Sequence, residues 1–145
     1  MTPPSSPDSP SRADERLRAA SALATALIVI ALGLALRFYG LGLGLPALIV
    51  KYGGSILWAM MVYLLLVALL PRRSPRQIGG LALAVAVTVE ASRLIHTPWL
   101  DSFRLTLAGA LLLGRIFSAW NIAAYAVGIL IGIGIERIVR RPGST

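Results

Sequence analysis

Two long runs without a charged residue constrain this chain most strongly. Residues 19–36 and residues 53–70 each hold eighteen residues with no Asp, Glu, Lys or Arg. An α-helix rises about 1.5 Å per residue, so such a run makes a helix of about 27 Å. That length is at the lower end of what crosses the hydrocarbon core of a bilayer. Each run therefore predicts a membrane-spanning helix.

The composition also indicates a membrane protein. Of the 145 residues, 57% are hydrophobic and 14% are charged, and the mean hydropathy is +0.78. An ordinary soluble domain has about 45–50% apolar and about 25% charged residues. A domain of this size cannot bury such an excess, so lipid has to cover much of its surface. The same figures exclude a chain that is disordered throughout, and the absence of Cys excludes disulfides, thiolate metal sites and cysteine nucleophiles.

Two further apolar segments, residues 78–95 and 119–135, complete a set of four predicted spans. In the loop between them, Thr97-Pro98 is typical of a helix start. We therefore predict an all-α membrane protein, a four-transmembrane-helix bundle with a short re-entrant or interfacial helix in the outward loop between spans three and four. The apolar segment 41–50 is too short to cross, and it is predicted to lie at the interface or to re-enter.

The ends of the chain flank a predicted membrane domain at 19–136. Residues 1–18 are predicted to be a disordered tail whose last residues begin the first helix, and residues 137–145 form a basic tail. Nine arginines lie in the two tails and the loop at 71–77, against four cations in the other two loops. This bias predicts cytoplasmic termini, and it assigns the net charge of +8 to topology and lipid headgroups rather than to nucleic acid.

The third predicted span contains two charges, Glu90 and Arg93. Each would cost about 2.5–3.5 kcal/mol at the centre of a membrane helix. Because they are three residues apart, they share a helix face and can pair. Two interpretations stay open: a salt bridge that stabilises the bundle, or one wall of a polar pocket near the outer leaflet.

Further polar residues are predicted to lie at the same outward level. Asp101 and Arg104 repeat the spacing of three in the outward loop, and Asn121 and Tyr125 enter at the outward end of the fourth span. An arginine-rich set with few acids favours a phosphate or another anionic headgroup. The predicted ligand-binding residues are Glu90, Arg93, Asp101, Arg104, Arg115, Asn121 and Tyr125.

The signals for an enzyme are weaker. The chain has a single His and neither an H-E-x-x-H nor a G-x-S-x-G pattern. No catalytic residue, metal or cofactor is therefore predicted, although Glu90 or His96 would be the base of a lipid-modifying enzyme. Gly128 and Gly132 form a small-xxx-small pair, which predicts close helix packing.

Several short motifs together resemble a known family. They are Lys51-Tyr52-Gly53-Gly54-Ser55-Ile56-Leu57-Trp58-Ala59, Pro98-Trp99-Leu100-Asp101-x-Phe103-Arg104, Leu111-Leu112-Leu113-Gly114-Arg115-x-Phe117-Ser118 and Ala124-Tyr125-x-x-Gly128-x-x-x-Gly132. Over residues 33–136 the chain resembles domain-of-unknown-function family 2809, small bacterial membrane proteins whose layout is similar to that of VanZ-like proteins. The resemblance implies the bacterial inner membrane and implies no activity.

The resemblance also assigns polar positions. Glu90, Asp101, Arg104, Arg115 and Tyr125 match the polar positions of the family pattern, whereas Ser55 and Asn121 stand where the resemblance implies Asp. The loss of two carboxylates weakens a metal or acid–base scheme and makes the outward cluster more positive.

The sequence therefore predicts an integral membrane protein that binds an anionic lipid or a cell-envelope precursor headgroup in an Arg-lined pocket near the outer leaflet. The alternatives are a structural or partner-binding membrane protein and a small transporter subunit. The transporter would need a homo-oligomer, which the face of Gly128 and Gly132 would supply.

Overall fold

A computed structural model describes residues 11–114 and 116–139, and this part of the chain is helical with no strand. Its helices are α1 (Arg12–Tyr39), α2 (Ala47–Leu69), α3 (Pro75–Ser92), α4 (Pro98–Leu105), α5 (Leu107–Leu112) and α6 (Ala119–Val139). The all-α prediction is confirmed in the described part.

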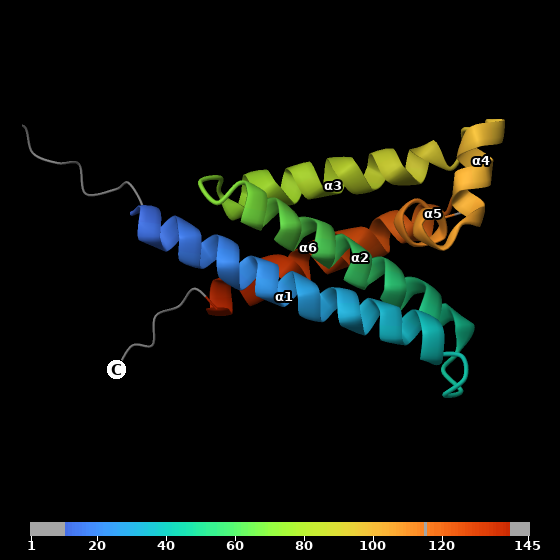
Figure 1. Ribbon diagram of the computed structural model, residues 1–145, viewed down its shortest axis with the longest axis horizontal. Coiled ribbons are helices and arrows are strands. Elements are labelled where there is room, and N and C mark those ends of the chain that lie inside the picture. Colours follow the sequence, from blue (N-terminus) through green and yellow to red (C-terminus); the bar gives the residue numbers. More distant parts are fainter. Residues whose placement is uncertain (1–10, 115, 140–145) are drawn as a thin grey trace, which may run out of the picture.

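The four long helices α1, α2, α3 and α6 run alternately in opposite directions (Figure 1). The start of α1, the loop between α2 and α3 and the end of α6 lie at one end of the molecule, here called the terminus end. The turn at 40–46 and the short helices α4 and α5 lie at the opposite end, here called the loop end. Helix α2 is central, because it packs against α1, α3 and α6.

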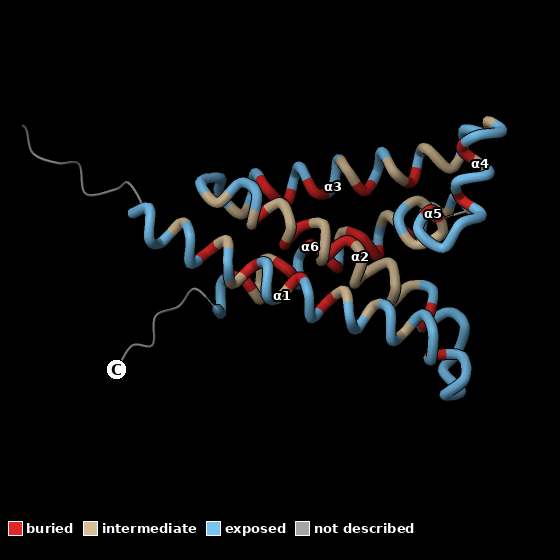
Figure 2. Tube along the Cα trace, viewed as in Figure 1, coloured by how far each residue is buried: buried red, intermediate tan, exposed pale blue. Residues whose placement is uncertain are grey.

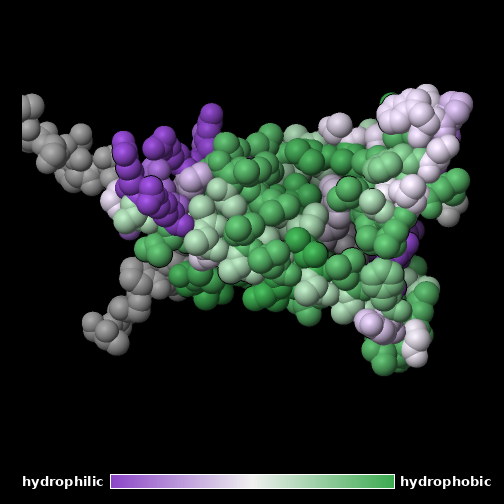
Figure 3. All heavy atoms as spheres, viewed as in Figure 1, coloured by the Kyte–Doolittle hydropathy of each residue, from purple (hydrophilic) through white to green (hydrophobic). Residues whose placement is uncertain are grey.

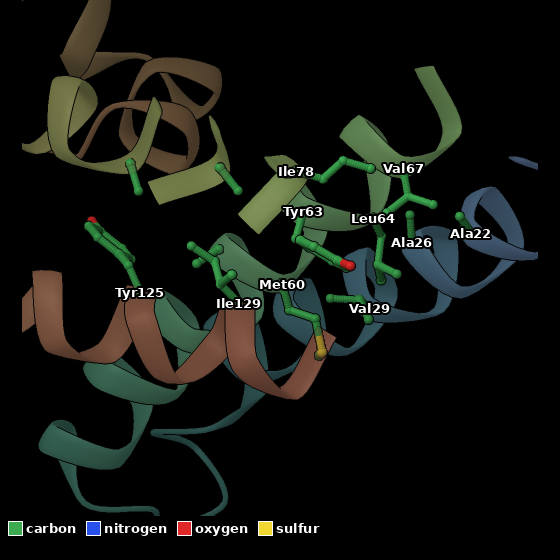
Figure 4. Close-up of a cluster of buried hydrophobic side chains, with 13 residues drawn as sticks. Ala22, Ala26, Val29, Met60, Tyr63, Leu64, Val67, Ile78, Tyr125 and Ile129 are labelled. Atoms are coloured by element: carbon green, nitrogen blue, oxygen red, sulfur yellow. The ribbon is translucent and has the colours of Figure 1, made fainter. Parts of the chain in front are cut away.

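The core forms where the buried faces of these helices meet (Figure 2). Its largest fully buried side chains include Tyr63 and Leu64 of α2 and Tyr125 of α6 (Figure 4). Helices α2 and α6 approach closely because α6 presents glycines to α2. A Cβ atom on Gly128 would collide with the carbonyl oxygen of Ile56, and one on Gly132 would lie 2.8 Å from the Tyr63 ring.

The outer surface of the bundle is apolar, which agrees with a membrane environment (Figure 3). Helices α1, α2 and α6 are long and apolar enough to cross a membrane. The chain is therefore a multi-pass membrane protein by length and composition. Helix α3 runs beside these three and carries the buried Glu90.

The helix boundaries refine the predicted ones at the first two spans. Helix α1 begins already at Arg12, because the side chains of Ser11 and Asp14 form a capping box, so the last residues of the predicted tail belong to the first helix. Residues 1–10 and 140–145 lie outside the described residues. Helix α2 begins at Ala47 directly after Pro46, so the predicted interfacial segment 41–50 is divided between a turn and the first turn of a spanning helix.

The segment between α3 and α6 holds two short helices where the sequence predicts one. Helix α3 ends at Ser92, three residues before the predicted end, and α4 has Pro98 in its first turn. At Thr106 the backbone becomes extended, and the Thr106 side chain accepts a hydrogen bond from the Gly109 amide at 3.1 Å. This cap starts α5 as a separate helix.

Candidate functional site

Glu90 is the centre of a polar cluster at the loop end. Its side chain is 0% exposed, and its carboxylate has four partners: three hydrogen-bond donors and the guanidinium of Arg93. Oε1 accepts hydrogen bonds from the Ser118 amide at 2.7 Å and from Asn121 Nδ2 at 3.1 Å. Oε2 accepts one from the Tyr125 hydroxyl at 2.7 Å and lies 2.6 Å from Nη1 of Arg93. A fully buried carboxylate requires this degree of satisfaction.

Arg93 uses its remaining donors on the segment between α5 and α6. Its Nε donates to the carbonyl of Leu113 at 2.6 Å, and its Nη1 donates to the carbonyl of Ile116 at 3.2 Å. The guanidinium also occupies the place of a side chain at Gly114, whose φ is +68°. A glycine is needed there both for the left-handed backbone and for the space. The Glu90–Arg93 pair thus fastens this segment to the end of α3.

Arg104 forms a second, neighbouring cluster. It is 3% exposed, and its Nη1 donates to the carbonyl of Ile95 at 2.8 Å and to Asp101 Oδ1 at 3.1 Å. Its Nη2 donates to the carbonyl of Ser92, so this arginine satisfies carbonyls at the C-terminal end of α3. His96 lies 3.4 Å from the same oxygen of Asp101, which is about half-exposed.

The structure brings four of the predicted ligand-binding residues into one network: Glu90, Arg93, Asn121 and Tyr125. It places Arg104 and Asp101 in the neighbouring cluster, and Arg115 lies outside the described residues. Because Arg93 and Arg104 donate mainly to the chain's own oxygens, they do not line an open pocket in the described part. The described residues also contain no group of three His, Cys, Asp or Glu placed to hold a metal.

Gly128 and Gly132, predicted as a packing pair, lie against Ile56 and Tyr63 of α2. This face of α6 therefore packs against α2 within the chain.

A groove of about 410 Å³ lies between α2 and α6 at the loop end. Its lining residues are Leu48 and Tyr52 of α2 and Trp120, Ala123, Ala124 and Val127 of α6. This surface is here called the α2–α6 groove. The exposed Lys51 stands beside it, with Nζ 5.1 Å from the centre of the Tyr52 ring.

Hydrogen bonds connect Glu90 to α2 beside the groove. The single hydroxyl hydrogen of Ser55 has two acceptors within reach, the carbonyl of Lys51 at 3.2 Å and Asn121 Oδ1 at 3.4 Å. The amide nitrogen of the same Asn121 donates to Glu90. Ser55 and Asn121, the two positions at which the resemblance implies Asp, are therefore neighbours.

A second buried ion pair lies at the terminus end, and sequence reasoning missed it. Arg18 of α1 and Glu136 of α6 are 8% and 5% exposed, with Nη2 and Oε1 2.7 Å apart. Tyr63 of α2 donates to the other carboxylate oxygen. Arg18 also donates to the carbonyls of Pro71 and, at 2.7 Å, of Arg73. Both charges stand next to tails in the sequence, where they look like flanking charges.

An exposed ion pair lies beside this cluster. Arg72 donates to Glu15 at 2.9 Å, and its side chain is 75% exposed. The hydrogen bond and the charge of Glu15 raise the pKa of the Arg72 guanidinium above its ordinary value.

Comparison with known proteins gives one family. The model described as "Protein of unknown function (DUF2809)" matches residues 44–129, which run from the turn before α2 to the middle of α6. No solved structure matches the chain.

Proposed function

Because the chain belongs to the DUF2809 family, whose function is unknown, its own geometry has to support an assignment, and we propose that it binds an anionic lipid in the α2–α6 groove. In this proposal the lipid chain lies along the groove, and the phosphate of the headgroup lies at Lys51. This keeps the class of ligand that the sequence predicts and moves its site.

The proposal includes a membrane topology. Helix α3 also crosses the membrane, in addition to α1, α2 and α6, while α4 and α5 lie at the interface and both termini are cytoplasmic. The exposed arginines Arg12, Arg16 and Arg76 at the terminus end support this orientation, because cytoplasmic flanks are enriched in positive charge. The inner membrane of a bacterium and a VanZ-like layout remain part of the proposal.

The chemistry of the groove is the observation that carries the assignment. Trp120 and Tyr52 line the part of the groove nearest the loop end, here called its mouth, and aromatic side chains of this kind favour the headgroup level of a bilayer. From Trp120 to Val127 the groove extends about 10 Å along α6, deep enough for the upper part of an acyl chain. Lys51 provides a cation at the mouth, where a lipid phosphate would lie.

The buried arginines have a different part in this proposal. Arg93 and Arg104 hold the polypeptide at the loop end together, so they shape the surroundings of the groove rather than bind the headgroup. A phosphate would have to displace carbonyls and carboxylates to reach them, which costs their existing charge-assisted hydrogen bonds.

Quenching of Trp120 fluorescence by brominated lipids tests the site. In a Trp58→Phe, Trp99→Phe background, Trp120 is the remaining tryptophan. Reconstituted into phosphatidylcholine bilayers, it should be quenched more strongly by chain-brominated phosphatidylglycerol than by chain-brominated phosphatidylcholine. Lys51→Gln should reduce this preference by about fivefold, roughly 1 kcal/mol for one lost charge near the surface.

Two variants sharpen the result. Ala123→Leu fills the groove and should weaken quenching by both lipids. Arg37→Gln removes a different exposed cation from the loop end, outside the groove lining, and should leave the preference unchanged. Equal quenching by the two lipids in the parent protein would overturn the assignment.

A further inference from the structure

We propose that Glu90 is a positioning residue for the α2–α6 groove: its carboxylate fixes the first turn of α6 and thereby the place of Trp120. This inference rests on the proposed function, because it concerns how that lipid site is held.

Trp120 depends on its backbone for its position. Its side chain is 74% exposed, so packing contributes little to holding it. The residues on either side of it along the chain are tied to one oxygen. Oε1 of Glu90 accepts from the Ser118 amide at 2.7 Å and from the Asn121 side chain at 3.1 Å. These two hydrogen bonds define how α6 starts at the mouth of the groove.

The same carboxylate reaches the other wall of the groove. The Asn121 amide group bridges Glu90 and Ser55, and Ser55 contacts the carbonyl of Lys51 one turn away. The α6 wall and the α2 wall are thus connected through Asn121. A change at Glu90 should therefore reach Trp120 directly and Lys51 through Ser55.

The negative charge itself is needed for this role. The N-terminus of a helix carries unpaired amides and a partial positive charge, which a carboxylate stabilises. In Glu90→Gln, one oxygen becomes an NH₂ group facing donors from Arg93, Tyr125, Ser118 or Asn121. No rotation of the amide satisfies all four donors, so the first turn of α6 should shift.

The test compares two buried acids in the Trp120-only background. Glu90→Gln should lower the relative binding constant of brominated phosphatidylglycerol by about fivefold, a typical coupling effect. It should also shift the emission maximum of Trp120 to longer wavelength, because a loosened side chain is wetter. Glu136→Gln, the matched control at the other end of the bundle, should leave both readouts unchanged. Equal changes in both variants, or none in Glu90→Gln, would overturn the proposal.

Two milder variants test the positioning role of Glu90 if Glu90→Gln does not fold. Tyr125→Phe removes one donor from Glu90, and Tyr63→Phe removes the corresponding donor from Glu136. The emission shift should appear in Tyr125→Phe and be absent from Tyr63→Phe.

The two proposals fail separately. A parent protein without lipid preference contradicts the proposed function, whereas the emission shift still tests the positioning role. A parent with the preference and a Glu90→Gln variant that keeps it contradicts the positioning role alone.

Discussion

The two ends of the bundle each contain a buried glutamate that is paired by similar residues. Each buries one glutamate against one arginine and one tyrosine: Glu90 with Arg93 and Tyr125 at the loop end, Glu136 with Arg18 and Tyr63 at the terminus end. The sources of the arginine differ. Arg93 directly follows the helix of its glutamate, three residues on, whereas Arg18 comes from the other end of the chain.

This difference decides what each cluster holds together. With its arginine supplied locally, the Glu90 cluster has donors left to fasten the segment before α6. The Glu136 cluster instead joins α1, α2, the loop after α2 and α6 at one point. The family segment at 44–129 contains the whole Glu90 cluster, while Arg18 and Glu136 lie outside it. The terminus-end cluster therefore attaches α1 to the segment shared with the family.

The largest effect is expected from Arg18→Ala. It removes the contact of Arg18 with the buried Glu136 and frees the carbonyls of Pro71 and Arg73. Removing one partner of a buried ion pair costs about 3–5 kcal/mol. Unfolding in mixed micelles should show a loss of this size, and Arg16→Ala, an exposed arginine on the same turn of α1, should show almost none. A loss below that of Glu90→Gln would reverse the ranking of the two clusters.

Glu90→Gln should destabilise less, by about 2 kcal/mol. The amide keeps one acceptor, and Arg93 keeps the carbonyls of Leu113 and Ile116, so the variant leaves a partly satisfied network. The unfolding midpoint in the same micelles measures this loss. Thr88→Val, on an exposed position of the same helix, is the control. An unchanged midpoint in Glu90→Gln would show that the cluster does not stabilise the bundle.

The local part of this comparison could be predicted from the sequence. Uncharged runs locate α1 and α2, and a spacing of three puts Glu90 and Arg93 on one face of α3. The position of Asn121 and Tyr125 at the start of a helix predicts that they lie near Glu90, and both donate hydrogen bonds to it. These predictions succeed because they depend on helix geometry and on the length of a span.

The features that could not be predicted depend on how helices that are distant in the sequence pack together. Arg18 and Glu136 each flank an apolar run, and nothing local distinguishes a flanking charge from a buried one. The α2–α6 groove was also missed, because it exists where Ala123 and Ala124 leave space beside α2. The hydrogen bonds that Arg104, a predicted ligand-binding residue, donates to carbonyls at the end of α3 depend on where that helix stops.

Substitution of the tyrosine in each cluster should lower the free energy of unfolding by less than the changes at Arg18 and Glu90. Tyr63→Phe and Tyr125→Phe each remove one hydroxyl from a buried carboxylate. Hydrogen bonds inside membrane proteins contribute about 0.6 kcal/mol on average and about 1.7 kcal/mol at most. Tyr125→Phe should cause the larger loss, because the Tyr125 hydroxyl donates to Glu90 and also accepts from Nη2 of Arg93 at 3.1 Å. Steric-trapping measurements of the free energy of unfolding resolve this difference, and a larger loss in Tyr63→Phe would contradict it.

The smallest effect is expected from the exposed ion pair beside the Arg18 cluster. Arg72 and Glu15 also join α1 to the loop after α2, but Arg72 is 75% exposed and water solvates its charge. Exposed pairs of this kind contribute little, and salt screens them. Arg72→Gln should leave the unfolding midpoint unchanged both in low salt and in 0.5 M NaCl. Arg18→Gln, its buried counterpart, should lower the midpoint equally at both salt concentrations, because the low-dielectric interior excludes the ions. A salt-dependent loss in Arg18→Gln would mean that water reaches the cluster, and burial would then no longer explain the difference between two arginines that hold the same helix to the same loop.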